Sequence, residues 1–282
     1  MSVLTTREDI AQHITHIKKE NLTVGFVPTM GALHDGHLSL IRYAQQFHQH
    51  IIVSIFVNPT QFNNASDLKA YPRTLDEDVT LLNTLEGAIT IYAPSPIEVY
   101  SGEITSNTYA FGKLETVMEG EHRPGHFDGV GTVLQLLFEQ VRPDEAFFGE
   151  KDFQQLQVVR KLVDVKNFDI KITGCPIHRE TNGLAMSSRN VRLTKVHKEA
   201  APFIYETLSQ VKNDFGTKSA NRLKDFVTQQ FDTQELLELE YFEIANVKNL
   251  HTLSRKRTNE KYRAFIAVWA GDVRLIDNIA LN

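Results

Sequence analysis

The sequence predicts an α/β protein with a parallel sheet, followed by a smaller α+β domain. Over the first 175 or so residues, short β-branched or aromatic runs alternate with stretches of helical spacing. This alternation implies right-handed crossovers and a Rossmann-like parallel sheet with helices on both faces. After residue 176 the alternation stops. We therefore expect two domains, residues 1–175 and residues 176–282, with the second closing over a site on the first.

The first domain is expected to alternate strands and helices in a regular order. The predicted strands are Thr23–Val27, Ile51–Val57, Ala88–Ala93, Ala146–Phe148 and Ile170–Thr173. The predicted helices between them are Leu38–Gln49, Leu75–Leu85, Val130–Val141 and Phe153–Val165. Ligands of such sheets bind beyond the carboxyl ends of the strands, so motifs that follow a strand are the candidates for a site.

The second domain has a different pattern. A loop, Pro176–Asn190, leads into helical segments near Lys195–Lys212 and Ala220–Gln230. The strands that follow are predicted at Glu238–Ala245, Tyr262–Ala270 and Val273–Ala280. Gly271 and Asp272 give a tight-turn signal between the last two strands, which therefore form a hairpin.

Composition limits the class of protein. The chain has 282 residues, of which 41% are hydrophobic and 23% charged, typical of a folded protein with a substantial core. A net charge of -5 argues against a general nucleic-acid-binding role. The single cysteine, Cys175, excludes an intrachain disulfide. Because the N-terminus lacks a signal-peptide core and no stretch approaches about 18 uncharged apolar residues, we expect a cytoplasmic protein without membrane association.

The first motif lies directly after a predicted strand and opens a helix. It reads Met30, Gly31, Ala32, Leu33, His34, Asp35, Gly36 and His37. Unpaired backbone N–H groups and the helix dipole attract anions at such a junction. Two imidazoles on one face of the first helical turn, with two glycines that allow close approach, suit a nucleotide. The alternative is a capped helix start with two surface histidines.

Two further motifs carry charge suited to phosphates. Gly149, Glu150, Lys151 and Asp152 follow another strand, and Met186, Ser187, Ser188 and Arg189 lie in the loop between the domains. Lys151 would bring a positive charge to the phosphates, and two hydroxyls with a guanidinium can bind a phosphate in a mobile loop. Taken separately, each motif is also compatible with an ordinary surface turn or loop.

Together the three motifs resemble those of the pantoate–β-alanine ligase (pantothenate synthetase) family. That family belongs to the nucleotidyltransferase superfamily, with HIGH-type and KMSKS-type motifs. The segment His34–His37 stands at the first motif and Met186–Asn190 at the second. The resemblance also covers Phe56–Phe62, Ala70–Thr74, Glu121–Val130, Phe148–Leu156 and Leu275–Ala280, in order along the whole chain.

The resemblance implies roles for individual residues. ATP is bound by residues 30–37, by residues 149–152, by residues 186–189 and by the backbone of His178. His37 is the implied proton donor, and His34, Lys151 and Arg189 neutralise charge. Gln61 and Gln155 hold pantoate, with Gln61 also at the β-alanine site. His178 replaces the aliphatic residue usual in the family, and the segment Ile97–Glu103 also departs from the family pattern.

The implied reaction is the ATP-dependent condensation of pantoate with β-alanine, through pantoyl-adenylate, to give pantothenate for coenzyme A synthesis. Mg²⁺ is expected to arrive with ATP, held mainly by phosphates. The resemblance also implies a homodimer. Two alternatives stay open: another small-molecule nucleotidyltransferase, and a non-catalytic nucleotide sensor or RNA-binding module.

A cluster of polar residues precedes the third predicted helix of the first domain. Arg123, His122 and His126 follow Glu119 and Glu121 closely in sequence. A metal site is one interpretation of this cluster, and a polar loop near the substrate entrance is the favoured one.

Overall fold

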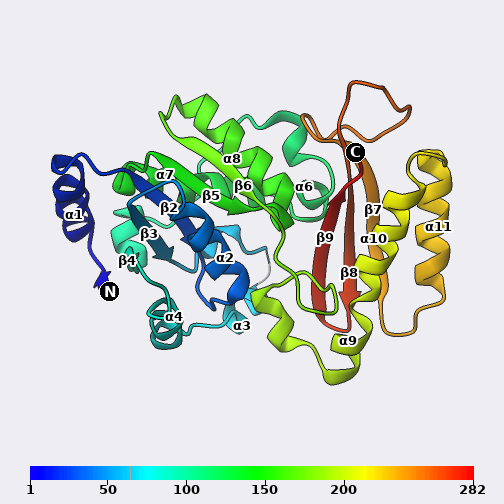
Figure 1. Ribbon diagram of the computed structural model, residues 1–282, viewed down its shortest axis with the longest axis horizontal. Coiled ribbons are helices and arrows are strands. Elements are labelled where there is room, and N and C mark those ends of the chain that lie inside the picture. The colour runs from blue at the N-terminus through cyan, green and yellow to red at the C-terminus, as the bar shows by residue number, and fades with distance from the viewer. Residues whose placement is uncertain (64) are drawn as a thin grey trace.

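The structure, a computed structural model, describes residues 1–63 and 65–282 (Figure 1). The strands of its first sheet are β1 (Ser2–Leu4), β2 (Val24–Thr29), β3 (His50–Ile55), β4 (Ala88–Tyr92), β5 (Glu145–Gly149) and β6 (Lys171–Cys175). The strands of its second sheet are β7 (Glu238–Asn246), β8 (Tyr262–Ala270) and β9 (Val273–Ala280).

Helices separate most of these strands. Up to β6 they are α1 (Arg7–Lys19), α2 (Asp35–Ala44), η1 (Pro59–Gln61), α3 (Ala65–Ala70), α4 (Leu75–Leu82), α5 (Pro96–Tyr100), η2 (Gly112–Glu115), α6 (Glu119–His122), α7 (His126–Val141), η3 (Glu150–Asp152) and α8 (Phe153–Lys166). After β6 they are η4 (Ser188–Arg192), α9 (Lys195–Ala200), α10 (Phe203–Asp214) and α11 (Ala220–Asp232). None of the helices in the described ranges is long and apolar enough to cross a membrane.

Within the described residues, the first sheet has six parallel strands in the order β1-β4-β3-β2-β5-β6. From β2 the chain winds outward through β3 and β4, and then returns to place β5 on the other side of β2. The strand order therefore switches between β2 and β5, which is where parallel α/β sheets bind ligands. The predicted fold class, a parallel sheet covered by helices with a smaller α+β part, is confirmed.

The strands of the first sheet alternate their side chains between two apolar layers. Phe26 and Phe148 face the layer that contains α1, α7 and α8, whereas Val27 and Phe147 face the layer that contains α2 and α4. This alternation follows from the two-residue period of a strand, and burial on both faces explains the continuous apolar runs in the sequence.

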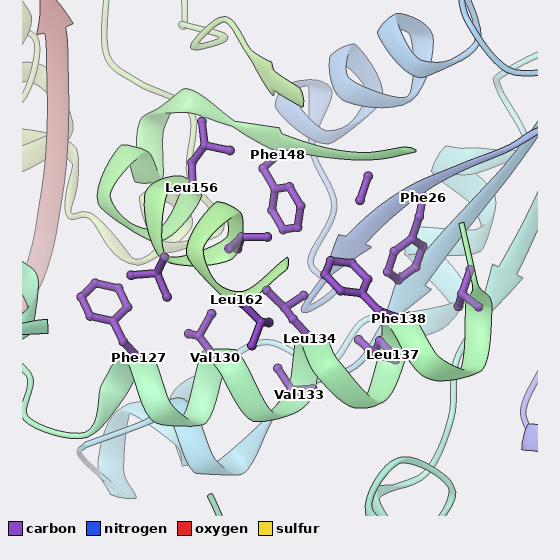
Figure 2. Packing of buried hydrophobic residues seen from close by; sticks show 14 of the residues in the cluster. Phe26, Phe127, Val130, Val133, Leu134, Leu137, Phe138, Phe148, Leu156 and Leu162 are labelled. Atoms are coloured by element: carbon purple, nitrogen blue, oxygen red, sulfur yellow. The ribbon is translucent and has the colours of Figure 1, made fainter. Parts of the chain in front are cut away.

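Helix α7 is the main cover of one face of the sheet. Figure 2 shows its side chains Val130, Leu134 and Phe138 pointing toward the strands and α8. The ring of Phe138 meets that of Phe26 edge to face, with 6.2 Å between centroids. The helix starts at His126, earlier than the predicted start at Val130. Its first turn therefore lies close to the carboxyl ends of the strands.

The second sheet lies beside the carboxyl ends of the first, with α10 and α11 packed on its outer side (Figure 1). It has its own apolar core, built from α10, α11 and strands β7 to β9. The helix predicted over Lys195–Lys212 is wrong as a single helix: it divides at Ala201–Pro202 into α9 and α10. Proline has no N–H to continue the hydrogen-bond ladder and crowds the preceding turn, so the chain restarts there.

Two elements at the N-terminus were not predicted. Strand β1 pairs with β4 at the edge of the sheet, and α1 buries Ile10, Ile14 and Ile17 against the same layer as α7. These three isoleucines have helical spacing but are separated by polar and charged residues. The division of the chain at residues 175 and 176 stays a prediction, and β6 ends at Cys175.

Candidate active site

The turn after β2 is held by a buried carboxylate. Gly31 and Ala32 both have positive φ angles, 76° and 50°, so the chain bends sharply before α2. The Asp78 side chain accepts hydrogen bonds from the N–H groups of Ala32 at 3.0 Å and Leu33 at 2.7 Å. Thr29 accepts another from the Gly31 N–H at 3.2 Å. Three backbone donors of this turn are thus satisfied internally.

The two histidines at the start of α2 are oriented by backbone groups. The Nδ1 atom of His34 accepts a hydrogen bond from the Gly36 N–H at 3.1 Å, and Nδ1 of His37 accepts one from the His34 N–H at 3.3 Å. Their ring centroids are 4.1 Å apart. Because Nδ1 is the acceptor in each ring, the proton of the neutral imidazole must lie on Nε2. Both rings line the same cavity.

Burial keeps these histidines uncharged. It lowers the pKa of His34 to about 4, helped by the positive charge of Lys151, and the pKa of His37 to about 3, helped by His34 and Lys151. Near neutral pH each ring is therefore a neutral hydrogen-bond donor through Nε2. Such donors suit phosphate oxygens.

The Lys151 loop is fixed from the second sheet. Asn278 donates hydrogen bonds to the carbonyl groups of Glu150 at 2.9 Å and Lys151 at 2.8 Å. The Glu150 carboxylate accepts one from Arg263 at 2.7 Å, so Glu150 is directed toward β8. Lys151 makes a loose ion pair with Asp152, 3.8 Å between Nζ and Oδ2.

The loop before η4 bridges the two parts of the chain. Ser188 donates a hydrogen bond to the carbonyl of Ala32 at 3.0 Å, and the Ser187 hydroxyl caps η4 by accepting from the Arg189 N–H at 3.3 Å. The Arg189 guanidinium forms an ion pair with Asp67 on α3 at 3.0 Å. This loop therefore contacts the turn after β2 directly.

The two glutamines come from different elements. Gln61 lies in η1, where its amide nitrogen is 2.8 Å from the Met30 sulfur and its amide oxygen accepts from Asn58 at 3.2 Å. Gln155 lies in the first turn of α8. Both line the cavity that the histidines line.

These elements enclose a cavity of ≈ 230 Å³ that adjoins a larger cleft of ≈ 500 Å³ toward the second sheet. Lys151, Asp152, Ser187 and Arg189 line both. The predicted site residues that line the smaller cavity are Met30, His34, Gly36, His37, Gln61, Gly149, Lys151, Asp152, Gln155, His178, Met186, Ser187, Ser188 and Arg189. The combined space is in the range of small-molecule sites.

Comparison with known proteins finds one family over nearly the whole chain. The family model described as pantoate-beta-alanine ligase matches residues 2–280. The chain belongs to the pantoate–β-alanine ligase family. It is 53% identical to the pantothenate synthetase of Flavobacterium psychrophilum over 282 residues, with 100% of both chains covered.

Solved structures of the pantoate–β-alanine ligase family also match over the whole chain. The pantothenate synthetase of Thermus thermophilus has a TM-score of 0.91 at 35% identity, covering 100% of this chain and 99% of that one. The pantoate–β-alanine ligase of Francisella tularensis, complexed with beta-gamma ATP and β-alanine, has a TM-score of 0.82 at 35% identity, with 100% and 98% covered. The predicted family, fold and enzyme class are confirmed.

Several predicted site residues do not line the cavity. These are Gly31, Ala32, Leu33, Asp35 and Glu150. The first three form the turn that Asp78 holds, Asp35 is exposed on α2, and Glu150 pairs with Arg263. A motif read as one string contains both residues that face a ligand and residues that shape the backbone. Their predicted roles in binding ATP stay predictions.

His178 lies on the rim of the cavity with an exposed side chain. Its carbonyl accepts a hydrogen bond from the Met186 N–H at 3.0 Å, beside a bridge between Arg179 and Ala185. This small hairpin orders the backbone on both sides of the loop. The predicted main-chain contact of His178 with adenine stays a prediction.

The polar cluster ahead of α7 is organised by ion pairs. Glu119 is buried and accepts hydrogen bonds from Arg274 and from Tyr241, each at 2.8 Å. Burial alone would raise the pKa of Glu119, but the hydrogen bonds and charge of Arg274 outweigh burial and lower it to about 2. In the described ranges, no group of three or more His, Cys, Asp or Glu side chains is arranged to hold a metal ion. Glu119 thus ties this cluster to the second sheet through Arg274 and Tyr241.

Sequence reasoning missed the residues that support the site from behind. These residues are polar, and their side chains form hydrogen bonds with backbone groups or ion pairs in and around the site. They are Asp78, Asn58, Asn278 and Arg179. The Arg179 guanidinium, for example, forms a bidentate ion pair with the buried carboxylate of Asp277, at 2.6 and 2.9 Å. Asp277 and Asn278 lie in the segment Leu275–Ala280 that matches the family, which was the available signal.

Proposed function

We propose that the protein condenses pantoate with β-alanine to form pantothenate, using ATP and releasing AMP and pyrophosphate. The observation that carries this proposal is the pair of neutral histidines at the switch point of the sheet, which line one cavity together with Lys151 and two uncharged glutamines. Membership of the family and the ATP analogue and β-alanine bound to the Francisella tularensis relative support it.

The nucleotide is assigned to the start of α2 and the loops around it. The N-terminus of α2 carries a partial positive charge that favours phosphate. His34 and His37 then donate hydrogen bonds through Nε2 to phosphate oxygens, and Lys151 and Arg189 supply positive charge. Ser187 and Ser188, which line the same cavity, add hydroxyl groups.

The acid substrate is assigned to Gln61 and Gln155. Amide groups both donate and accept, so they can pair with hydroxyl and carboxylate groups without adding charge. In the first step a carboxylate oxygen of pantoate attacks the α-phosphorus of ATP, and the bond to the pyrophosphate oxygen breaks. Both reactants are anions, so positioning, hydrogen bonds from the neutral His34 and His37, and the positive charge of Lys151 should dominate catalysis.

The second step needs no further neutralisation of phosphate charge, because pyrophosphate has already left. The amine of β-alanine attacks the acyl carbon of pantoyl-adenylate, and the carbon–oxygen bond to AMP breaks. The attacking amine loses a proton, and AMP leaves as a stable phosphate monoester. No covalent enzyme intermediate is required, and the thiol of Cys175 is buried with its pKa raised to about 12.

Other properties follow from the same proposal. Mg²⁺ would be held mainly by the ATP phosphates. Of the carboxylates among the predicted site residues, Asp152 is the one that lines the cavity. We infer a homodimer and a cytoplasmic location from the family. These inferences are independent of the site geometry.

The test is an omission assay with the purified chain. Pyrophosphate release from MgATP should require pantoate, and AMP should accumulate over many turnovers only when β-alanine is also present. Release that depends instead on a phosphate monoester would favour another nucleotidyltransferase. Tight ATP binding without any AMP formation would favour a nucleotide sensor.

A further inference from the structure

The backbone of Gln61 is held by the first residue of α7 and by Arg123, which follows α6. Its carbonyl oxygen accepts a hydrogen bond from Nδ1 of His126 at 2.8 Å and a longer one from Arg123 at 3.3 Å. Gln61 itself lies in a three-residue 3₁₀ helix, which has few internal hydrogen bonds to fix it. These contacts therefore fix the position of the Gln61 backbone, from which its side chain extends into the cavity.

Close packing reinforces these hydrogen bonds. A Cβ atom added to Gly129 would lie 2.3 Å from the carbonyl oxygen of Thr60, so only glycine lets α7 approach η1 this closely. The carbonyl of Gly129 in turn accepts a hydrogen bond from Asn58 at 3.1 Å, and the same Asn58 amide donates to the Gln61 side chain at 3.2 Å. One short stretch of α7 thus contacts both the backbone and the side-chain partner of Gln61.

His126 is suited to this contact because it is buried and uncharged. Only 5% of the residue is exposed. Burial, together with the positive charge of Arg123, lowers the pKa of His126 to about 3. Since the carbonyl of Gln61 can only accept, the ring proton of the neutral imidazole must lie on Nδ1. Its tautomer is therefore the opposite of that of His34 and His37.

We propose that His126 is a positioning residue for the acid substrate, which acts by fixing Gln61 through its backbone carbonyl. The inference rests on the proposed function, in which the Gln61 amide holds pantoate. His126 need not touch a substrate. Its effect should fall mainly on pantoate, because His126 holds the backbone of η1, whereas ATP recognition is assigned to the start of α2 and to the loops that carry Lys151 and Arg189.

Three substitutions of His126 test this directly. His126→Ala should raise the KM for pantoate about 10- to 50-fold, with the KM for ATP and kcat within about threefold of the wild type, since it removes the shorter of the two hydrogen bonds to the Gln61 carbonyl. His126→Asn places an amide nitrogen near the position of Nδ1 and should restore the pantoate KM to within about threefold. His126→Gln carries its amide farther out and should not restore it.

A matched control separates positioning from loss of stability. The side chain of His48 is only 8% exposed and pairs with Glu145 at 3.2 Å, but it lies at the amino ends of β3 and β5, away from the cavity. His48→Ala should lower the melting temperature without changing the pantoate KM. Gly129→Ala, which forces η1 away from α7, should reproduce the pantoate-specific loss.

The outcomes are distinguishable. An active wild type in which His126→Ala has a normal pantoate KM, or raises the KM of all three substrates alike, would overturn this inference alone. Failure of His126→Asn to recover while His126→Gln does would also overturn it. A wild-type chain that makes no pantothenate would overturn the proposed function and this inference with it.

Discussion

His34 and His37 lie where a positive charge is unfavourable, between a buried turn and the Lys151 side chain. Each uses Nδ1 as an acceptor for a backbone N–H and so presents Nε2–H to the cavity. The backbone, and not a neighbouring carboxylate, sets the tautomer. Two donors of fixed direction result, whose hydrogen bonds can strengthen as charge develops on the phosphate.

Replacing His37 by alanine should slow adenylate formation severely while leaving the fold intact. The lost donor should slow pyrophosphate release by on the order of 10²–10³-fold, the usual cost of removing one preorganised donor. Rapid-quench measurement of pyrophosphate with pantoate and ATP checks this. His16→Ala is the control, since His16 is exposed on α1. Near-normal release from the His37 variant would contradict the assignment.

Lys151→Ala should weaken the first chemical step more than the second. Pyrophosphate leaves in the first step, so the neutralising charge of Lys151 matters most there. Single-turnover assays can start either from ATP and pantoate or from synthetic pantoyl-adenylate and β-alanine. Lys161→Ala, on the exposed side of α8, serves as the control. Equal losses in both steps would show that Lys151 does not act on the leaving group.

The turn between β2 and α2 depends on a residue from another element. Asp78, on α4, satisfies two N–H groups of a turn that contains a non-glycine residue, Ala32, in the left-handed region. Strain and hydrogen bonding are thus balanced at one position, and the direction of α2 depends on that balance.

Asp78→Ala should therefore both destabilise the protein and weaken ATP binding. Two buried N–H groups would lose their acceptor, at a cost of about 1–3 kcal/mol each. We expect a lower free energy of unfolding in urea and a higher KM for ATP, with the pantoate KM little changed. Asp76→Ala, on the exposed side of the same helix, is the matched control. An unchanged ATP KM in the Asp78 variant would show that the turn keeps its shape without the carboxylate.

The sequence identifies elements well where local pattern and burial agree. Strands β2 to β6 are apolar runs with turn signals beside them, and all were predicted within a few residues. Helix α1 was not predicted because polar and charged residues separate its three buried isoleucines. The division at Pro202 was overlooked because helical spacing continues on both sides of it.

The candidate site divides in the same way. The motifs identify the segments that meet at the switch point, because their glycines, histidines and Lys151 follow strands. They do not identify Asp78 or Asn278, and they do not reveal the contact of His126 with Gln61, because these effects depend on partners far away in the sequence. Orientation also lies beyond a motif, as Glu150 shows by pairing with Arg263.

At the scale of the whole molecule, buried histidines make stability depend on pH. The pKa is lowered to about 4 for His34 and His50 and to about 3 for His37 and His126. The unfolded chain binds protons below about pH 6.5 that the folded chain does not bind. The stability contributed by the neutral rings is therefore complete above pH 6.5 and is lost as the pH falls toward 4.

The free energy of unfolding should consequently fall between pH 7 and pH 5. A fully buried histidine contributes a slope of at most about 1.4 kcal/mol per pH unit. The raised pKa of Asp277 acts in the opposite direction, so the informative quantity is a difference between variants. Urea titrations across this range should give a shallower slope for His126→Asn than for the wild type. Equal slopes would mean that His126 is protonated in the folded protein.

The two parts of the chain are joined at the site itself. Ser188 bonds to the turn after β2, Asn278 holds the Lys151 loop, and Arg274 pairs with Glu119. These contacts bring the loop before η4 and the second sheet against the cavity where phosphate and acid would meet. We expect this shared cavity to activate the acid as its adenylate.

Transfer of oxygen from the pantoate carboxylate to AMP tests this adenylate mechanism. Pantoate labelled with ¹⁸O in its carboxylate is incubated with the protein, MgATP and β-alanine, and the products are analysed by mass spectrometry. Attack of the carboxylate on the α-phosphorus predicts that each AMP carries one ¹⁸O, with the other retained in the amide of pantothenate. Label in inorganic phosphate or pyrophosphate, or unlabelled AMP, would contradict the adenylate mechanism.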